Sequence, residues 1–384
     1  MAPPMRARPL RKDLLPTAFK NSKAQVLSET AGGRATTTLA PNIRSISWSP
    51  TGALLAGSTS VNIRVWNPER PELRASTELR DSAKGGAHGK LVERITFNPC
   101  VEGLLASTGV DGMVKVWDVR MPGSAAAAAS GSAAAGARGG TTGKAGEYKL
   151  GDEGLFLTWH PDGTQLLVGR RDDVVHAVDI RRSNLPLLDI TNTAGGNFAS
   201  SAALKYDLID TDRTPVKEHG NFNMMSFSNS GRQLFATTHD GPVVVFDYPS
   251  MQPIYTIKAH TRDTYAVQQS PLGNYVAIGA SDSMITLWDT ETWLCEHSLM
   301  HHTSSVRDLS FSFDGAYLVA GAGQDGSKDG DKGMAIYHVD TGDLVHTVDT
   351  VNPVTWASWH PHRYAIAHAG DPGGLKIVGP FGNA

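Results

Sequence analysis

Cysteine is nearly absent from this sequence, because its 384 residues include only Cys100 and Cys295. Two cysteines are too few for a disulfide framework, which favours a reducing cytosol or nucleus over secretion. The sequence also lacks a secretory signal peptide and any run of about 18 apolar residues, the length that spans a bilayer. We therefore expect an intracellular protein that has no membrane segment and no membrane partner.

A strong excess of one charge is also missing, since the formal net charge is -3. Near-neutral bulk charge gives no support to direct nucleic-acid binding, although it leaves a local basic patch open. The 40 glycines are abundant, and they suit a fold of many short strands and tight turns. The hydrophobic fraction of 40% is enough for a continuous core.

Residues 1–35 form the most basic stretch, with Arg6, Arg8, Arg11 and several lysines against few acids. The stretch contains prolines and no sustained periodicity, so we predict a disordered tail. Three interpretations stay open: a solvated leader, a nuclear-import element or partner-binding arm, and a mitochondrial presequence.

After this tail, one pattern recurs: an apolar strand, a turn, a second strand, Gly or Ser before Asp, and a third strand ending in Trp-Asp or a variant. Its clearest copies are ISWSPTGALLAGSTSVNIRVWN, ITFNPCVEGLLASTGVDGMVKVWD and VQQSPLGNYVAIGASDSMITLWD, which end at Asn67, Asp118 and Asp289. Weaker copies end at Asp179, Asp247 and His338, and a seventh, ASWHPHRYAIAHAGDPGGLKIVG, follows. Repeats of about 40 to 45 residues with this wording are typical of WD40 propellers. The sequence therefore predicts an all-β fold, a seven-bladed WD40 β-propeller over residues 36–384.

Fixed offsets within the repeat assign structural roles. The third strands carry an equivalent large residue at Trp66, Trp117, Val178, Phe246, Trp288 and Tyr337. An Asp recurs six residues earlier at Asp111, Asp172, Asp240 and Asp282. We expect these carboxylates to bond turn backbone and the histidines His88, His260 and His302.

Long steps between repeats indicate insertions. We predict loops at about 121–150, 191–220 and 324–333, the first rich in Ala, Gly and Ser. A strand near Ala35 to Leu39 is expected to pair with the C-terminal blade and close the ring, which removes its exposed edge.

Catalytic motifs are missing from the pattern. GGTTGKAG around Lys144 lacks the first Gly and the final Ser or Thr of a phosphate-binding loop. The loop from Asp325 fails the calcium-loop pattern, and the histidines near His301 and His360 fit turn positions better than metal sites. We therefore expect no catalytic residues, no cofactor, no metal site and no small-molecule substrate, and hence a protein that is not an enzyme.

One equivalent position near the start of each first strand is the candidate protein-binding face. Aligning the repeats places there Arg44, Glu93, Leu155, Asn223, Tyr265, Arg307 and Thr355. Mixed charge with an aromatic side chain suits a protein or peptide better than a polyanion. The alternative is that these are ordinary solvated loop residues.

Several stretches resemble the THO complex subunit 3 family in order and spacing. They are GRRDDVVHAVD from Gly169, FDYPSMQPIYTIKAH from Phe246, GNYVAIGASDSMITLWD and VRDLSFSFDGAYLVA, and the similarity runs from about Ile43 to Val378. The resemblance implies a nuclear, non-catalytic scaffold in a THO/TREX-type complex that couples transcription to mRNA packaging and export. It implies large helical THO subunits and other mRNA-export factors as partners, with RNA contacted mainly through them.

A second interpretation comes from Trp117, Asp118 and Arg120, which resemble the WDxR box of propellers that recruit substrates to cullin-type ubiquitin ligases. In the structural alternative, Arg120 simply ends a strand at the edge of a blade.

Overall fold

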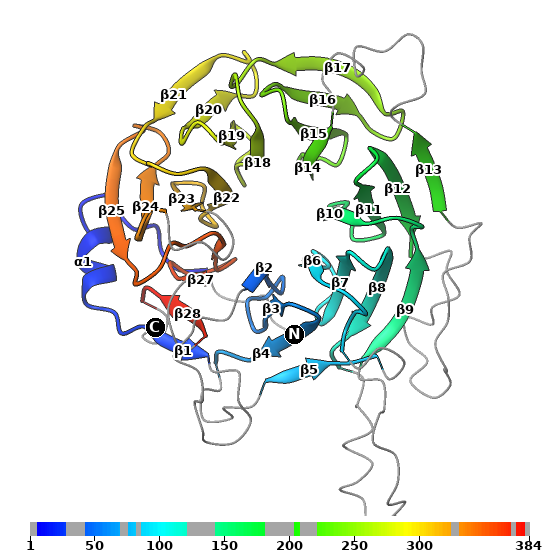
Figure 1. The fold of residues 1–384 in the computed structure, drawn as a ribbon. Helices are drawn as coiled ribbons and strands as arrows, with labels where there is room; N and C mark the ends of the chain where they lie inside the picture. The colour runs from blue at the N-terminus through cyan, green and yellow to red at the C-terminus, as the bar shows by residue number, and fades with distance from the viewer. Residues whose placement is uncertain are drawn as a thin grey trace, which may run out of the picture.

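The computed structural model describes residues 6–27, 43–69, 76–81, 86–120, 143–180, 203–207, 221–323, 330–369 and 374–380. In these ranges, the strands form seven four-stranded antiparallel sheets. The sheets are arranged as blades around a common centre (Figure 1). The predicted seven-bladed β-propeller is confirmed.

The first three blades follow chain order, from the innermost strand to the outermost one. Blade 1 contains β2 (Ile43–Trp48), β3 (Leu55–Thr59), β4 (Asn62–Trp66) and β5 (Thr77–Leu79). Blade 2 contains β6 (Val92–Phe97), β7 (Leu104–Gly109), β8 (Met113–Asp118) and β9 (Lys144–Lys149). Blade 3 contains β10 (Gly154–Trp159), β11 (Gln165–Arg170), β12 (Val174–Asp179) and β13 (Ala203–Asp207).

Blades 4 to 6 repeat the same order. Blade 4 contains β14 (Phe222–Phe227), β15 (Gln233–Thr238), β16 (Val243–Asp247) and β17 (Gln252–Ile257). Blade 5 contains β18 (Thr264–Gln269), β19 (Tyr275–Ala280), β20 (Ile285–Asp289) and β21 (Cys295–Leu299). Blade 6 contains β22 (Val306–Phe311), β23 (Tyr317–Ala322), β24 (Gly333–His338) and β25 (Leu344–Asp349).

Blade 7 joins the two ends of the described chain. It contains β26 (Ala357–Trp359), β27 (Ile366–His368) and β28 (Leu375–Val378), and its outermost strand is β1 (Gln25–Leu27). β1 pairs antiparallel with β28, with Val26 opposite Lys376. Ring closure by an N-terminal strand was expected, but the strand lies about ten residues before the predicted Ala35 to Leu39, which fall outside the described residues.

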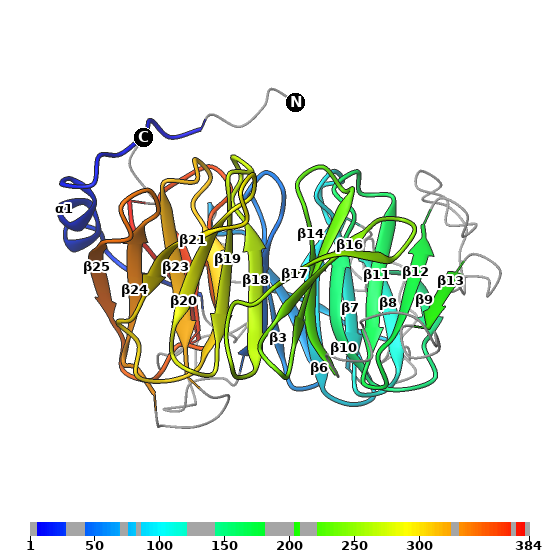
Figure 2. The ribbon, with the colours of Figure 1, turned by 90° about the horizontal axis from the view of Figure 1, so that it is seen from above.

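The N-terminal segment corrects a second expectation. Residues 6–27 are not a disordered tail, because they contain α1 (Leu15–Lys20) and β1. Leu15 and Phe19 are buried in a core cluster with side chains of blades 6 and 7. In side view, α1 lies against the outside of β25, and the chain before it extends over one face of the disc (Figure 2). This segment is ordered because it packs against blades 6 and 7, which its basic sequence alone does not indicate.

Two predicted insertions also contain strands. β9 lies within the expected loop at 121–150, and β13 lies within the one at 191–220. Each supplies the outermost strand of its blade. The exposed outer strand of a sheet does not need an apolar sequence, so its pattern is weak. The remainder of the first loop, residues 121–142, lies outside the described residues, as do 181–202, 208–220 and 324–329.

The core lies between neighbouring blades. All six residues of β7 and of β23 are buried, as expected for the inner strands of stacked sheets. The equivalent third-strand residues lie in these layers as predicted: Trp66, Trp117, Val178, Phe246 and Tyr337 are buried and Trp288 is half-buried. One cluster packs Ile63 and Val65 of blade 1 against Val92 and Phe97 of blade 2.

Blade 2 also contains a buried charge cluster that the sequence pattern did not predict. The Lys115 side chain is fully buried, and its Nζ donates to Asp81 at 2.6 Å and to the carbonyl oxygen of Ala87 at 2.8 Å. Lys144 donates to the same Asp81 carboxylate at 3.0 Å. A buried ammonium group requires such a partner, because its desolvation costs several kcal/mol.

Candidate protein-binding site

A β-bulge recurs at the second residue of the innermost strand in six blades. In blade 1, Ile43 pairs with Thr59 and Ser45 with Ser58, so the pairing passes over Arg44. The other five blades show the same shift. The residues passed over, which we call the bulge ring, are Arg44, Glu93, Leu155, Asn223, Tyr265 and Arg307.

The bulge ring contains the residues that the sequence alignment picked out, apart from Thr355, which lies two residues before β26. A bulge leaves one residue unpaired and redirects its side chain, which is why bulges often lie beside functional sites. No residue pattern in the sequence signals the bulge itself. The bulged residues were found because they occupy the same position in each aligned repeat.

Contacts between neighbouring blades connect members of the bulge ring. The Arg44 guanidinium donates to both carboxylate oxygens of Glu93, at 3.2 and 3.1 Å. The Arg307 guanidinium carbon lies 3.8 Å from the centroid of the Tyr265 ring, a cation–π contact. Asn223 donates through Nδ2 to the carbonyl oxygen of Thr264 at 2.8 Å. These contacts hold half-buried side chains in defined positions around one mouth of the propeller.

Two donors of the bulge ring have no partner among the described residues. The Nε–H groups of Arg44 and Arg307 are buried and donate to no acceptor in that part of the chain. A buried donor without a partner costs about 1 to 3 kcal/mol.

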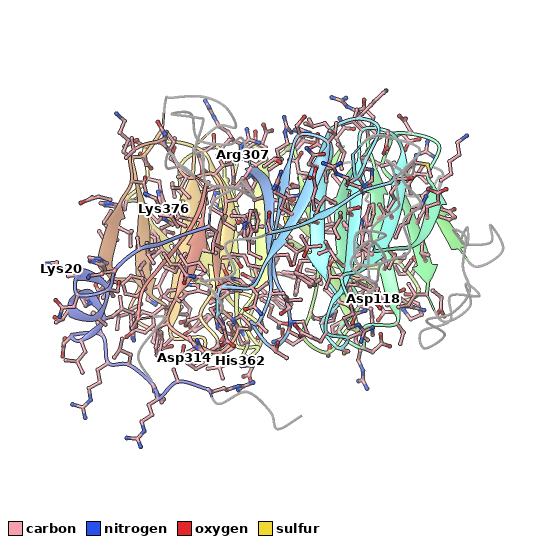
Figure 3. The ribbon with its side chains drawn as sticks, turned by 90° about the horizontal axis from the view of Figure 1, so that it is seen from below. Lys20, Asp118, Arg307, Asp314, His362 and Lys376 are labelled. Atoms are coloured by element: carbon pink, nitrogen blue, oxygen red, sulfur yellow. The ribbon has the colours of Figure 1, made fainter. Side chains whose placement is uncertain are left out.

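The two faces of the disc carry different groups. Arg307 lies on one face, whereas Asp314, His362 and Asp118 lie toward the opposite one (Figure 3). We call the first the ring face. The N-terminal segment extends over the second, which we call the strap face.

A cavity of about 240 Å³ lies among the innermost strands, below the bulge ring. Its lining includes Arg94, Asp308 and Trp356, and the Arg94 guanidinium carbon lies 4.1 Å from the centroid of the Trp356 ring. Asp308 accepts hydrogen bonds from the backbone N–H groups of Leu309 and Ala357, both at 3.1 Å. Burial raises the pKa of Asp308 to about 7, although the charge of Arg94 acts in the opposite direction.

The predicted histidine–aspartate contacts are confirmed in blades 2 and 5. His88 Nδ1 lies 2.9 Å from Asp111, and His260 Nδ1 lies 2.7 Å from Asp282. In blade 2 the chain of bonds continues from His88 Nε2 to Ser107 Oγ at 2.7 Å. These buried histidines connect the loop that precedes each blade to the turn and the strands of that blade.

In blade 6, the aspartate that pairs with the loop histidine was not identified from the sequence alignment. His302 bonds Asp331 at 3.0 Å, and Asp331 stands six residues before Tyr337, as the offset requires. It lies at the end of the expected insertion, which obscured the repeat. Asp172 departs from the pattern, because its carboxylate accepts from Arg170 at 2.5 Å.

The residues of the alternative adaptor motif have separate roles. Trp117 is fully buried and donates from Nε1 to Ser107 at 2.9 Å. Arg120 has a side chain that is 54% exposed and donates to both oxygens of Asp118, at 2.8 and 2.7 Å. Arg120 alone therefore offers substantial contact surface.

Within the described ranges, no group of three or more His, Cys, Asp or Glu side chains is arranged to hold a metal ion. No helix in that part of the chain has both the length and the apolar character needed to cross a membrane.

Seven four-stranded blades with this repeat define a WD40 β-propeller protein. The family model of the WD domain, G-beta repeat, matches residues 84–118, 251–289 and 293–327. A solved structure, the β-propeller domain of Cps50 (Swd1) from Myceliophteria thermophila, superposes with a TM-score of 0.64 at 18% identity. That match covers 90% of this chain and 99% of the other one, and it shows the fold alone.

Among curated proteins, the chain is similar to THO complex subunit 3 of Arabidopsis thaliana. The two are 28% identical over 331 residues, which cover 86% of each chain. WD repeat-containing protein AAC3 of Dictyostelium discoideum is 24% identical over 290 residues, covering 70% of this chain and 51% of that protein.

Proposed function

We propose that this chain is a non-catalytic scaffold subunit of a nuclear THO/TREX-type complex that couples transcription to mRNA packaging and export. The similarity to THO complex subunit 3 extends over most of both chains, which supports an equivalent role for the whole propeller. Its partners are large helical subunits and other mRNA-export factors. They carry most of the contact with RNA.

The bulge ring is the proposed docking site for such a partner, and it is the observation that carries the proposal. Arginine and tyrosine are the side chains that contribute most to protein interfaces, and Arg307 and Tyr265 are held together here. The half-buried guanidinium groups of Arg44 and Arg307 suit carboxylate or carbonyl oxygens on a protein. The Arg44–Glu93 pair makes the ring unsuitable for a polyanion, because Glu93 would repel it.

The alternative is a substrate-recruiting adaptor of a cullin-type ubiquitin ligase. It rests on exposed Arg120, since the accompanying Trp117 is in the core. Asp118 lies toward the strap face, away from the bulge ring, so the two proposals use different surfaces (Figure 3).

This separation makes one experiment decisive. The tagged protein is purified from nuclear extract after nuclease treatment, and partners in stoichiometric amounts are identified by mass spectrometry. The wild type is compared with a Tyr265→Ala/Arg307→Ala variant and with Arg120→Ala, each checked for an unchanged melting temperature. Each variant is the control for the other.

The proposal predicts large helical THO subunits with the wild type and Arg120→Ala, and their loss with the double variant. Loss of a ligase linker protein on Arg120→Ala would establish the adaptor instead. Retention of every partner by the double variant would refute the bulge ring as the docking site.

A further inference from the structure

Positive charge is concentrated at the N-terminus of an otherwise acidic protein. Residues 1–27 contain six Arg or Lys and one Asp, a net charge of +5, whereas the whole chain carries -3. The remaining residues therefore carry -8. Such a contrast produces a local positive field that the overall composition conceals.

This basic segment is fixed to the strap face. The backbone N–H of Ala7 donates to the carbonyl oxygen of His362 at 2.9 Å, and that of Leu10 to the Tyr364 hydroxyl at 2.9 Å. Tyr317 donates its hydroxyl to the carbonyl oxygen of Leu10 at 2.7 Å. Lys12 forms an ion pair with Asp343.

Residues between these anchors project basic side chains into solvent. Arg6, Arg8 and Arg11 are exposed, whereas Ala7 and Leu10 are half-buried against the core. We call residues 6–12 the basic strap. An anchored strap loses less conformational entropy on binding than a free tail does, so each arginine contributes more to the binding free energy.

A groove of about 450 Å³ lies at the C-terminal end of α1, on the helix that follows the strap in the chain. Its lining includes Phe19, Lys20, His346, Thr347 and Asp349. The His346 ring centroid lies 5.9 Å from that of Phe19, and His346 is half-buried. Burial, helped by the charge of Lys20, lowers the pKa of His346, which keeps the imidazole neutral and suited to stacking.

The chemistry of strap and groove together favours nucleic acid over an acidic peptide. Guanidinium groups bind phosphate in a bidentate manner, and an aromatic ring in a pocket of this size stacks a base. Asp349 would repel a carboxylate or a phosphate inside the groove, but its carboxylate is able to accept a hydrogen bond from a ribose 2′-hydroxyl. Exposed Lys20 and Lys23 extend the positive surface beside the groove.

We infer that the basic strap and the α1 groove bind single-stranded RNA directly, with phosphates on Arg6, Arg8 and Arg11 and a base against His346. This contact is separate from the bulge ring and does not depend on the proposed docking of protein partners. It adds a direct RNA contact to the partner-mediated one.

The test measures binding of the full chain to a fluorescent oligouridylate of about 20 nucleotides by anisotropy. The strap variant Arg6→Gln/Arg8→Gln/Arg11→Gln is compared with a control variant, Lys149→Gln/Arg232→Gln/Lys258→Gln. The control removes the same charge from exposed residues on blades 2 and 4.

The strap variant is expected to bind about 100-fold more weakly at about 0.1 M salt, since each released counterion is worth roughly fivefold there. Its slope of log affinity against log salt should fall by about 2, at roughly 0.7 per lost phosphate contact. The charge-matched control should remain within about twofold of wild type. His346→Ala should weaken oligouridylate binding by about tenfold and leave binding of inorganic polyphosphate unchanged.

Equal losses in the strap and control variants would overturn the inference, because bulk charge would then explain binding. Polyglutamate competing as well as oligouridylate would assign the strap to an acidic protein. Equal affinity for oligodeoxythymidylate would rule out recognition of the 2′-hydroxyl, and an unaffected His346→Ala variant would rule out the groove.

Discussion

Removing the carboxylate from the buried charge cluster of blade 2 should cost far more stability than removing its buried cation. Asp81→Asn leaves the Lys115 ammonium fully buried without its counter-charge, so that only neutral acceptors remain, the amide oxygen of the new side chain and the Ala87 carbonyl oxygen 2.8 Å away. Breaking a buried ion pair in this way costs about 3 to 5 kcal/mol. Lys115→Met puts an apolar chain of similar length in the same space, while Asp81 keeps Lys144 at 3.0 Å. We expect a loss below about 2 kcal/mol.

Guanidinium unfolding followed by tryptophan fluorescence measures both losses as shifts of the midpoint at an unchanged m value. The double variant Asp81→Asn/Lys115→Met should recover most of the loss of Asp81→Asn, because no unpaired buried charge remains. Arg171→Met is the surface control: it breaks an ion pair with Glu153 in which the arginine side chain is 70% exposed, and should cost less than about 1 kcal/mol. Equal losses for the two single variants, or additive losses in the double variant, would refute this reasoning.

Three further predictions concern the cavity among the innermost strands, the closure of the ring by β1 and the packing of a blade. Burial raises the pKa of Asp308 from 3.8 to about 7, so the folded state binds a proton on this carboxyl group more tightly than the unfolded state does. The stabilisation that the bound proton provides is therefore lost as the pH rises from about 4 to about 7. Unfolding at pH 5 and pH 8 should show Asp308→Asn gaining on wild type at the higher pH by at most about 2.7 kcal/mol, because about two pH units below the raised pKa are crossed at about 1.36 kcal/mol each. An unchanged difference would contradict this. Leu27→Asp places a charge in the buried side of β1 and should lower the melting temperature by several degrees, whereas exposed Val26→Asp should not. Gly169→Ala brings a Cβ within 1.8 Å of the Phe156 ring and should destabilise by about 1 to 3 kcal/mol, which denaturant unfolding would detect.

The repeat made the blades predictable because each one must bury the same faces. Apolar inner strands and a large residue such as Trp117 recur at fixed offsets, and the structure places them in the layers between blades. The same periodicity located the bulge ring, including Tyr265 and Arg307, without any knowledge of the bulge. What a repeat fixes in every blade can be read from the sequence.

Features that belong to one blade only were missed. The order of residues 6–27 comes from single contacts, such as Tyr317 with Leu10, that no periodic pattern encodes. β9 has the sequence KAGEYK, which lacks an apolar alternation because one edge of an outer strand faces solvent. Lys115 was missed for the opposite reason, since a buried cation contradicts the pattern that identified its strand.

The pairing of β1 with β28 also bears on how the protein is made. β1 pairs with β28, which is translated about 350 residues later, so blade 7 cannot form until the chain has been made through β28. The basic strap depends on the same late event, because His362 and Tyr364, two of its anchors, belong to the C-terminal blade. A ribosome-bound or truncated chain can therefore fold its middle blades and still not present an ordered strap. Display of that surface therefore indicates that the chain has been made at least as far as blade 7.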